Sequence, residues 1–360
     1  MRDHKIIELL FATLNSALFG APVKEEAYRY LSETEWQSLF KLATRQGVLA
    51  IAYDVILQLP NNCHPPRNIN LAWALSVEAI EDRYKKQLMG AKYLAEVWNS
   101  AGIKTIVMKG IALGQYYPIP EHRECGDFDC YLLNDKYEEG NLIAEQHGAK
   151  VNREWYKHSQ IYFREMMAEN HLFLVTTRKG KSTKYLNKIL INCLNKELQY
   201  FPNSKILLPT TEFNALFVTY HSFAHFMSEG ITLRHLCDWA CFIKAEENNI
   251  DWGNFYNLCK RFQFDRFVDV SNAIIATYFG IEFQNKAIIC SSPYTDKVIQ
   301  DILIEDSKIF SGVKGKWRKR WKLITNIYNY SWKFRDIGYS SSTKYLLKIV
   351  VGFLLKREQH

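Results

Sequence analysis

The chain of 360 residues has no apolar run that approaches the length of a membrane span. Crossing a bilayer as a helix takes about 20 consecutive apolar residues, so the sequence predicts no membrane-spanning helix. Its N-terminal stretch carries acidic residues within the apolar part and has no small-residue cleavage site. We therefore expect a first helix there and not a secretory signal peptide.

Paired cysteines are also missing. The eight cysteines are scattered and include no Cys-x-x-Cys pair, although Cys237 and Cys241 lie one helical turn apart. That spacing favours packing on one helix face over a zinc site. In a chain without a signal peptide we expect reduced thiols and a cytoplasmic location.

The charge is unevenly distributed. The formal net charge is +8, yet residues 310–360 hold 12 Lys and Arg against 2 Asp and Glu. The rest of the chain is therefore slightly acidic, and the basicity belongs to a C-terminal tail. Hydrophobic residues make up 48% of the chain and aromatic residues 14%, which is typical of a packed globular protein and excludes a disordered one.

Periodicity predicts helices on both sides of a mixed central region. We expect a helical region over 1–101, a core sheet over 102–178, a helical region lining a cleft over 179–300, and a basic helical tail over 301–360. Ser32 and Glu35 have the spacing of a capping box ahead of Trp36. A long helix is predicted from about 70 to 100, and residues 178–205 are expected to form a connecting helix.

The central region reads as strand, glycine turn, short helix and strand, followed by an antiparallel meander. The first strand is expected over 104–108, and Lys109-Gly110 forms the turn into a helix over 111–117. A helix over 134–146 and strands over 151–155, 160–164 and 169–176 follow. The stretch Asp127-Phe128-Asp129 opens the second strand, where alternate side chains share a face. Two carboxylates so close require a neutralising charge, usually a divalent cation.

These residues resemble the signature of a bacterial family of uncharacterised nucleotidyltransferases within the DNA-polymerase-β-like superfamily. The resemblance covers the chain from Trp36 to about Lys244 and rests on short motifs distributed along it. They are Val107-Met108-Lys109-Gly110, Tyr117-Pro118, Arg123, Asp127-Phe128-Asp129, His158, Glu169-x-His171, the His221 and His225 pair, Leu233-Arg234 and Asp238. The chain departs from the superfamily pattern at the turn, where Lys109-Gly110-Ile111 replaces Gly-Ser.

The resemblance implies an α+β fold with a small mixed or antiparallel sheet as polymerase-β-like core, flanked by helical regions. It implies that Asp127, Asp129 and a third carboxylate, Glu169, are catalytic and bind Mg²⁺ or Mn²⁺. The predicted reaction moves a nucleoside monophosphate from a nucleoside triphosphate (NTP) such as ATP to a hydroxyl or phosphate of a small molecule, sugar or peptide, and it releases pyrophosphate.

Other polar residues are assigned by position and charge. Lys109, Gly110 and Arg123 are expected to bind the nucleotide phosphates, although Lys109 could pair with a site carboxylate instead. A further set is expected to line the cleft, with hydrogen-bonded structural roles as the alternative for the histidines: His158, His171, His221, His225, Arg234 and Asp238. Arg234 and Asp238 are spaced to pair within one helix, and a zinc site at His221 and His225 is disfavoured.

Two other functions remain open at this point. The same carboxylates could serve a phosphotransferase or hydrolase. The chain could also be a non-catalytic protein that binds a membrane or nucleic acid through its tail. That tail interleaves cations with tryptophans over 314–322 and has an apolar run over 345–355. Such segments lie on anionic membranes, contact nucleic acid or dock on the protein's own core.

Overall fold

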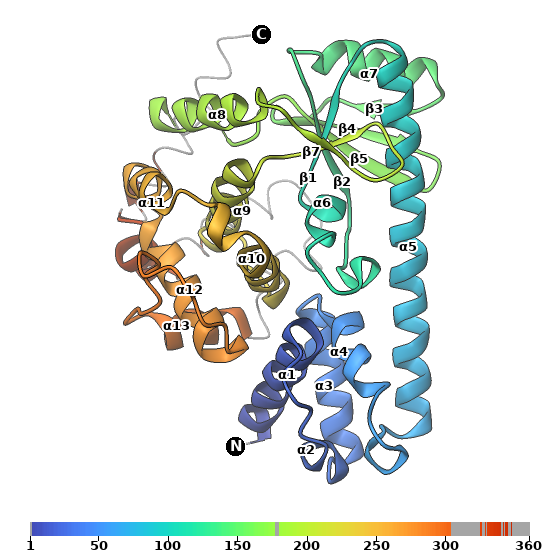
Figure 1. Cartoon of the computed structure of the whole chain (residues 1–360), viewed down its shortest axis with the longest axis vertical. Helices are drawn as coiled ribbons and strands as arrows, with labels where there is room; N and C mark the ends of the chain where they lie inside the picture. The colour runs from blue at the N-terminus through green and yellow to red at the C-terminus, as the bar shows by residue number, and fades with distance from the viewer. Residues whose placement is uncertain are drawn as a thin grey trace.

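The computed structural model describes residues 2–176, 180–303, 325, 328, 330–339, 341, 343, 344 and 347 (Figure 1). A mixed sheet of seven strands, in the order β3-β4-β5-β2-β1-β7-β6, forms its centre. The strands are β1 (Thr105–Met108), β2 (Phe128–Leu132), β3 (Lys150–Asn152), β4 (His158–Phe163), β5 (Met166–His171), β6 (Gln199–Tyr200) and β7 (Ile206–Leu208). With helices around this sheet, the α+β class is confirmed.

Two pairs of neighbouring strands are parallel and the other four are antiparallel. The strand β2 pairs in parallel with β5, and β1 pairs in parallel with β7. The segment from β3 to β5 is the expected antiparallel meander. The parallel β2–β5 pairing places Asp129 directly opposite Glu169, so two of the predicted catalytic carboxylates sit side by side.

Several boundaries of the sheet and its connections differ from the sequence prediction. The strand β5 is Met166–His171 and not 169–176. Asp127 lies in the bend before β2, whose first residue is Phe128. The predicted helix over 178–205 is shorter, since α8 (Lys181–Leu194) gives way to β6 and β7. The sheet therefore extends beyond residue 178, because the β6–β7 hairpin adds to the β1 edge.

The N-terminal region is helical, as predicted. It holds α1 (Arg2–Phe19), α2 (Glu26–Arg29), α3 (Glu33–Arg45), α4 (Leu49–Ile56) and the 34-residue α5 (Arg67–Ser100). The capping box at Ser32 and Glu35 is present at the start of α3. Helix α5 runs from the N-terminal helices to the sheet in Figure 1. Its buried Trp73 packs in one core cluster and its buried Trp98 in the other.

Helix α7 (Tyr137–Gln146) covers the sheet, and the remaining helices form the other side of the molecule (Figure 1). They are α9 (Thr211–Phe226), α10 (Leu233–Glu246), α11 (Trp252–Arg261), α12 (Asp265–Phe279) and α13 (Thr295–Leu303). Short α6 (Gly110–Gly114) follows β1. The chain reverses between α9 and α10, which brings these two helices to face the ends of β1 and β2.

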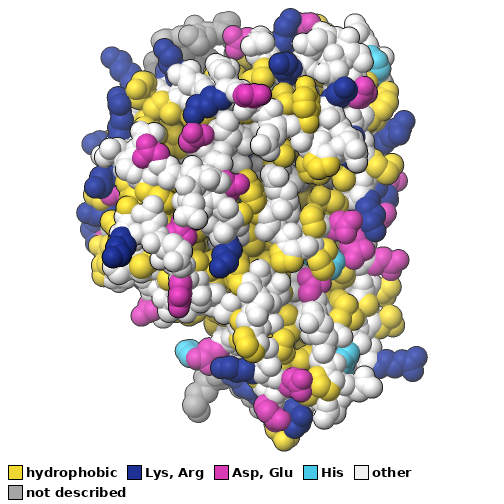
Figure 2. Space-filling model, viewed as in Figure 1, with side chains coloured by type: hydrophobic (Ala, Val, Ile, Leu, Met, Phe, Trp, Pro, Cys, Tyr) yellow, Lys and Arg dark blue, Asp and Glu magenta, His cyan; other side chains and the backbone are white. Residues whose placement is uncertain are grey.

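Part of the C-terminal tail packs on this helical side. Phe334 and Ile337 are fully buried, and Lys333 forms an ion pair of 2.6 Å with Asp301 of α13. The basic stretch over 314–322 lies outside the described residues, as does the apolar run over 345–355 apart from Leu347. No helix among the described residues has the length and apolar character to cross a membrane. Figure 2 shows basic, acidic and hydrophobic side chains interspersed over one face.

Candidate active site

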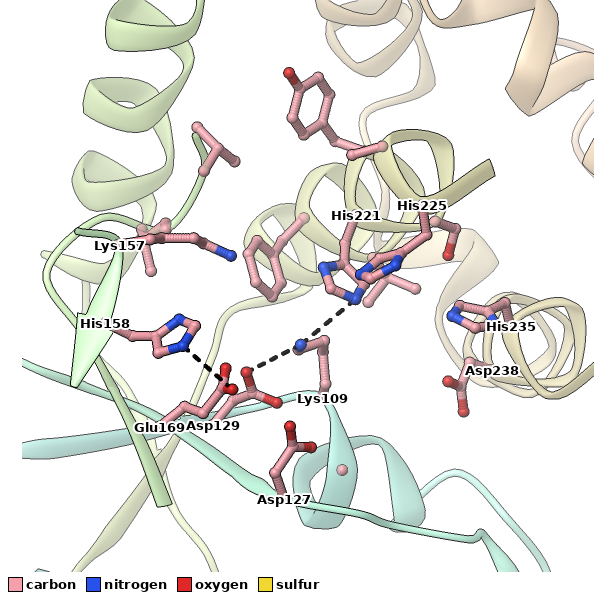
Figure 3. A pocket seen from close by; sticks show the side chains of 18 of the residues that line it. Lys109, Asp127, Asp129, Lys157, His158, Glu169, His221, His225, His235 and Asp238 are labelled. Atoms are coloured by element: carbon pink, nitrogen blue, oxygen red, sulfur yellow. Dashed lines mark hydrogen bonds and ion pairs between the residues drawn. The ribbon is translucent and has the colours of Figure 1, made fainter. Parts of the chain in front are cut away.

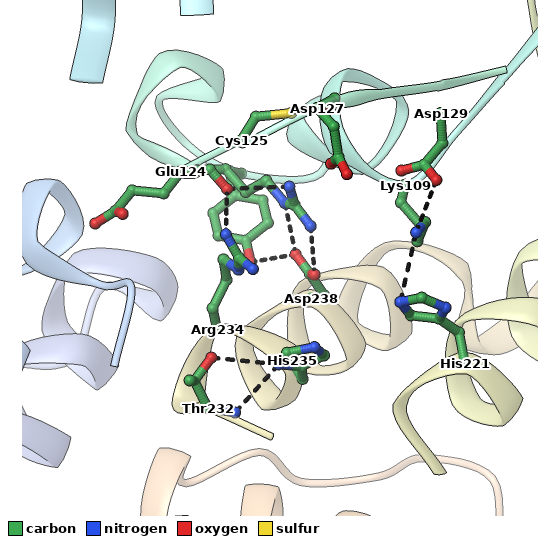
Figure 4. Close-up of polar contacts among 12 residues, drawn as sticks. Lys109, Glu124, Cys125, Asp127, Asp129, His221, Thr232, Arg234, His235 and Asp238 are labelled. Atoms are coloured by element: carbon green, nitrogen blue, oxygen red, sulfur yellow. Dashed lines mark hydrogen bonds and ion pairs between the residues drawn. The ribbon is translucent and has the colours of Figure 1, made fainter. Parts of the chain in front are cut away.

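One cavity of about 960 Å³ gathers eleven of the twelve predicted site residues. It lies between the sheet and the helices α9 and α10. We call its two sides the sheet wall (Lys109, Asp127, Asp129, Lys157, His158 and Glu169) and the helical wall (His221, His225, Arg234, His235 and Asp238) (Figure 3 and Figure 4). The twelfth predicted residue, His171, does not line the cavity and lies buried behind the carboxylates.

The turn between β1 and α6 is backbone-strained and carries Lys109 into the cavity. Lys109 has φ of +52° and Gly110 has φ of +35°, a region that residues with a side chain rarely adopt. A Cβ at Gly110 would also meet the Cys125 sulfur at 2.8 Å, so only glycine fits there. In this conformation the Lys109 ammonium reaches Asp129.

Asp129 is the most enclosed carboxylate of the site. It is 2% exposed, and its Oδ1 lies 3.0 Å from the Lys109 ammonium and 2.9 Å from His171 Nε2. Burial alone would raise the pKa of Asp129, but Lys109 and His171 together hold it well below its usual range. Lys109 thus pairs with a site carboxylate, one of its two predicted alternatives.

Asp127 has a different environment from Asp129. No described residue donates a hydrogen bond to its carboxylate, which lines the same cavity. Burial, and then repulsion by Asp129, raises the pKa of Asp127 above its ordinary value. A carboxylate in this state gains stability from any cation that enters the cavity.

Glu169 is held by two histidines. His158 Nε2 lies 3.3 Å from Glu169 Oε1, and His171 Nε2 lies 3.6 Å from Glu169 Oε2. Burial opposes ionisation, but these histidines lower the pKa of Glu169. Burial also lowers the pKa of His158 to about 4, so its ring is neutral at pH 7. His158, Glu169 and His171 offer one potential metal-ligand atom each, all within 4.8 Å of one another.

The helical wall contributes the imidazoles of His221, His225 and His235. His221 Nε2 lies 3.4 Å from the Lys109 ammonium, and the His221 and His225 rings are 4.4 Å apart. Burial, and then the charge of Lys109, keeps the pKa of His221 well below its ordinary value. A neutral His221 is therefore a hydrogen-bond acceptor for Lys109. His235, which the sequence analysis did not single out, bonds Thr232 at the start of α10 (Figure 4).

A buried ion pair joins the loop before β2 to α10. Arg123 donates to both oxygens of Asp238, at 2.9 and 2.7 Å, and the Tyr117 hydroxyl adds a bond of 2.7 Å. Arg234 donates to the Glu124 carbonyl at 2.9 Å (Figure 4). The predicted pairing of Arg234 with Asp238 inside one helix is therefore wrong, because the Arg123 fork takes both carboxylate oxygens. The predicted polar network is present, with a different partner.

Lys157 is a site residue that sequence reasoning missed. It lines the cavity, and its side chain points inward in Figure 3. Burial, and then repulsion by Lys109, lowers the pKa of Lys157 to about 8. Its position one residue before His158 was the available signal, but no local pattern separates it from surface lysines.

Comparison with known protein families assigns the chain to one of them. No curated protein and no solved structure matches the chain. Residues 32–280 match the family described as "Uncharacterised nucleotidyltransferase". That match takes in the whole sheet, the three carboxylates and both walls of the cavity. The chain therefore belongs to this family of nucleotidyltransferases, enzymes that transfer phosphorus-containing groups.

Proposed function

We propose that the protein transfers a nucleoside monophosphate from an NTP to an acceptor and releases pyrophosphate, in a reaction that depends on a divalent metal. The observation that carries this proposal is the meeting of Asp127 and Asp129, at the start of β2, with Glu169 on the adjacent parallel strand β5. Three carboxylates on one cavity wall would repel the anionic triphosphate unless metal cations bind to them.

The donor set fits Mg²⁺ or Mn²⁺. Both ions prefer carboxylate oxygens, and Asp127 offers a carboxylate without a described partner, whose raised pKa a cation would relieve. Asp127, Asp129 and Glu169 would hold the metal. When bound, it would neutralise charge on the triphosphate and polarise the α-phosphoryl group. His158 and His171 flank Glu169 and would orient its carboxylate.

The protein's own residues would bind the phosphates and move one proton. The Gly110 backbone and Lys109 would contact the triphosphate. Arg123 would join them only by leaving Asp238, because it already donates to Asp238 and to the Glu124 carbonyl. Glu169, ionised at neutral pH, would accept the proton of an acceptor hydroxyl as general base.

A polymerase-β-like core is supported by the order of the elements. Strand, turn, short helix and a carboxylate-bearing strand follow one another, and the third carboxylate comes from a later neighbouring strand. A bacterial source, a cytoplasmic location and ATP as donor are part of the same proposal. The acceptor is proposed to be a small molecule, sugar or peptide.

The test is to incubate the protein with Mg²⁺, a cell extract and each NTP labelled at the α-phosphate. We expect label to appear on an acceptor together with pyrophosphate. The same extract with γ-labelled NTP is the control. Transfer of the γ-label without pyrophosphate would replace this proposal with a phosphotransferase.

The basic tail bears on where the protein works. We propose that any attachment to an anionic membrane or to nucleic acid is peripheral and falls with salt, since each basic residue near a membrane contributes about 1 kcal/mol. The burial of Phe334 and Ile337 supports docking of the tail on the core instead. Full-length protein that binds neither anionic vesicles nor DNA at low salt would leave docking as the tail's role.

A further inference from the structure

Lys157 differs from the other cations of the cavity in having no partner. Lys109 pairs with Asp129, Arg123 pairs with Asp238, and Arg234 donates to a carbonyl. Within the described part of the chain, nothing accepts a hydrogen bond from the Lys157 ammonium. Its side chain is nevertheless aimed into the cavity (Figure 3).

The main chain fixes where Lys157 stands. Its carbonyl accepts hydrogen bonds from the Leu172 amide at 2.9 Å and the Phe173 amide at 3.1 Å. These bonds tie Lys157 to the end of β5, next to the pair of His158 and Glu169. The main chain at Lys157 is therefore held by the edge of the sheet and does not belong to a free loop.

The Lys157 side chain is partly buried and lines the cavity without a described partner. An anionic ligand group in contact with its ammonium would supply that partner through a charge-assisted hydrogen bond. The cavity therefore contains one cation that is unpaired in the free protein and suited to an anion.

The order of the strands indicates which of the two substrates, the NTP or the acceptor, carries that anionic group. Asp129 on β2 lies between β1, which leads to the Gly110 turn, and β5, which carries Glu169. In-line displacement places the leaving pyrophosphate and the attacking acceptor on opposite sides of the α-phosphorus. With the triphosphate at the Gly110 turn and the base at Glu169, Lys157 stands on the acceptor side.

We propose that Lys157 binds an anionic group of the acceptor, so that the substrate is a hydroxyl compound carrying a phosphate monoester or a carboxylate. This assignment rests on the nucleotidyltransferase function proposed above. The acceptor oxygen forms a bond to the α-phosphorus and its proton passes to Glu169. The bond from the α-phosphorus to the bridging oxygen breaks, and pyrophosphate leaves with that electron pair.

The test is anion binding to the protein saturated with Mg²⁺ and a non-hydrolysable NTP analogue. Inorganic phosphate and acetate are titrated separately by calorimetry, which distinguishes a phosphate from a carboxylate preference. The variants are Lys157→Gln and Lys157→Arg. The matched control is Lys150→Gln, since Lys150 is an exposed residue of the edge strand β3. Affinity for the NTP analogue is measured first for every variant.

We expect wild-type protein and Lys150→Gln to bind one of the two anions. Lys157→Gln should weaken that binding at least tenfold, Lys157→Arg should restore most of it, and affinity for the NTP analogue should stay within twofold. Equal anion binding by Lys157→Gln, or none by the wild-type complex, overturns the inference. A tenfold loss of NTP-analogue affinity in Lys157→Gln places Lys157 on the triphosphate and also overturns it. If wild-type protein does not bind the NTP analogue at all, the proposed function itself fails.

Discussion

The two walls of the cavity hold their charges in different ways. On the sheet wall, Asp127 and Lys157 have no described partner, and Asp129 and Glu169 are shared among Lys109 and two histidines. On the helical wall, Asp238 is saturated by Arg123 and Tyr117. A charged side chain without a partner destabilises the ligand-free protein. A charged side chain whose hydrogen bonds are satisfied holds the helices and loops that it joins together.

We therefore expect changes on the sheet wall to act mainly on ligands and turnover, and changes on the helical wall to act mainly on stability. The same reasoning separates two carboxylates that are only two residues apart. The surroundings disfavour the ionised form of Asp127, whose pKa is raised. They favour the ionised form of Asp129, whose pKa is lowered.

The largest expected effect is the loss of activity in Asp127→Asn and Asp129→Asn. Each removes a proposed metal ligand, and the loss of several kcal/mol of charge stabilisation corresponds to about 10³-fold in rate. Calorimetric titration with Mg²⁺ or Mn²⁺ plus NTP should show binding strongly weakened in both variants. Unchanged affinity in both would rule out the metal site. Asp82→Asn, on the exposed surface of α5, is the control.

Stability should separate the same two variants in the metal-free protein. Asp127→Asn removes a carboxylate whose pKa is raised by burial and by Asp129, so its melting temperature should rise. Asp129→Asn leaves Lys109 and His171 without their shared partner, so its melting temperature should fall. Melting curves without metal at pH 7.5 check this, and shifts of the same sign would contradict the comparison of the two residues.

Glu169→Gln should retain the fold and NTP affinity while turnover falls about 10²- to 10⁴-fold, the usual contribution of general base catalysis. The amide cannot take the acceptor proton, but it can still bond His158 and His171. Pyrophosphate release and the melting temperature are measured together. A variant that melts much lower, with full activity per folded molecule, would make Glu169 a structural residue.

Local patterns predicted much of this architecture. Helical periodicity located α3, α5, α9 and α10, and short apolar runs located β1 and β2, because these signals come from residues close in sequence. The Asp-x-Asp motif and the later Glu169, read together with the family resemblance, identified three carboxylates that line one cavity. No local pattern, however, indicated the parallel pairing of β2 with β5.

What sequence reasoning missed depends on contacts between distant residues. The strands β6 and β7 have two and three residues, too short for any alternation to show. The partner of Asp238 is Arg123, 115 positions away, so the spacing of Arg234 and Asp238 gave the wrong pair. Lys157 became a site residue only through its place before β4, where its carbonyl is bonded to the residues that follow β5.

On the helical wall, Asp238→Ala should reduce stability by about 3–5 kcal/mol, the usual cost of removing one member of a buried ion pair. The Arg123 guanidinium, 7% exposed, would be left without its carboxylate. Arg123→Lys is the matched variant, which keeps the charge but loses the bidentate fork and should cost less. Urea unfolding measures both, and a loss below about 1 kcal/mol in Asp238→Ala would contradict the distinction between the walls.

The smallest expected effect lies away from the cavity, at Asp269 of α12. Burial, and then repulsion by Asp265, raises the pKa of Asp269 to about 6, and its buried Oδ1 has no hydrogen-bond partner among the described residues. Like Asp127→Asn, Asp269→Asn should stabilise the protein at pH 7.5, by about 1–2 kcal/mol once solvent screening is allowed for. Activity should not change, because Asp269 does not line the cavity.

The pH dependence gives Asp269→Asn its own signature. The folded protein holds a proton on Asp269 up to about pH 6, whereas the unfolded chain releases it near pH 4. The contribution of Asp269 to the free energy of unfolding of the wild-type protein is therefore present at low pH and is lost as pH rises through 6. The advantage of Asp269→Asn should be full at pH 7.5 and shrink between pH 6 and pH 4. Urea unfolding across that range checks it, and an advantage that stays constant with pH would show that Asp269 is ionised normally.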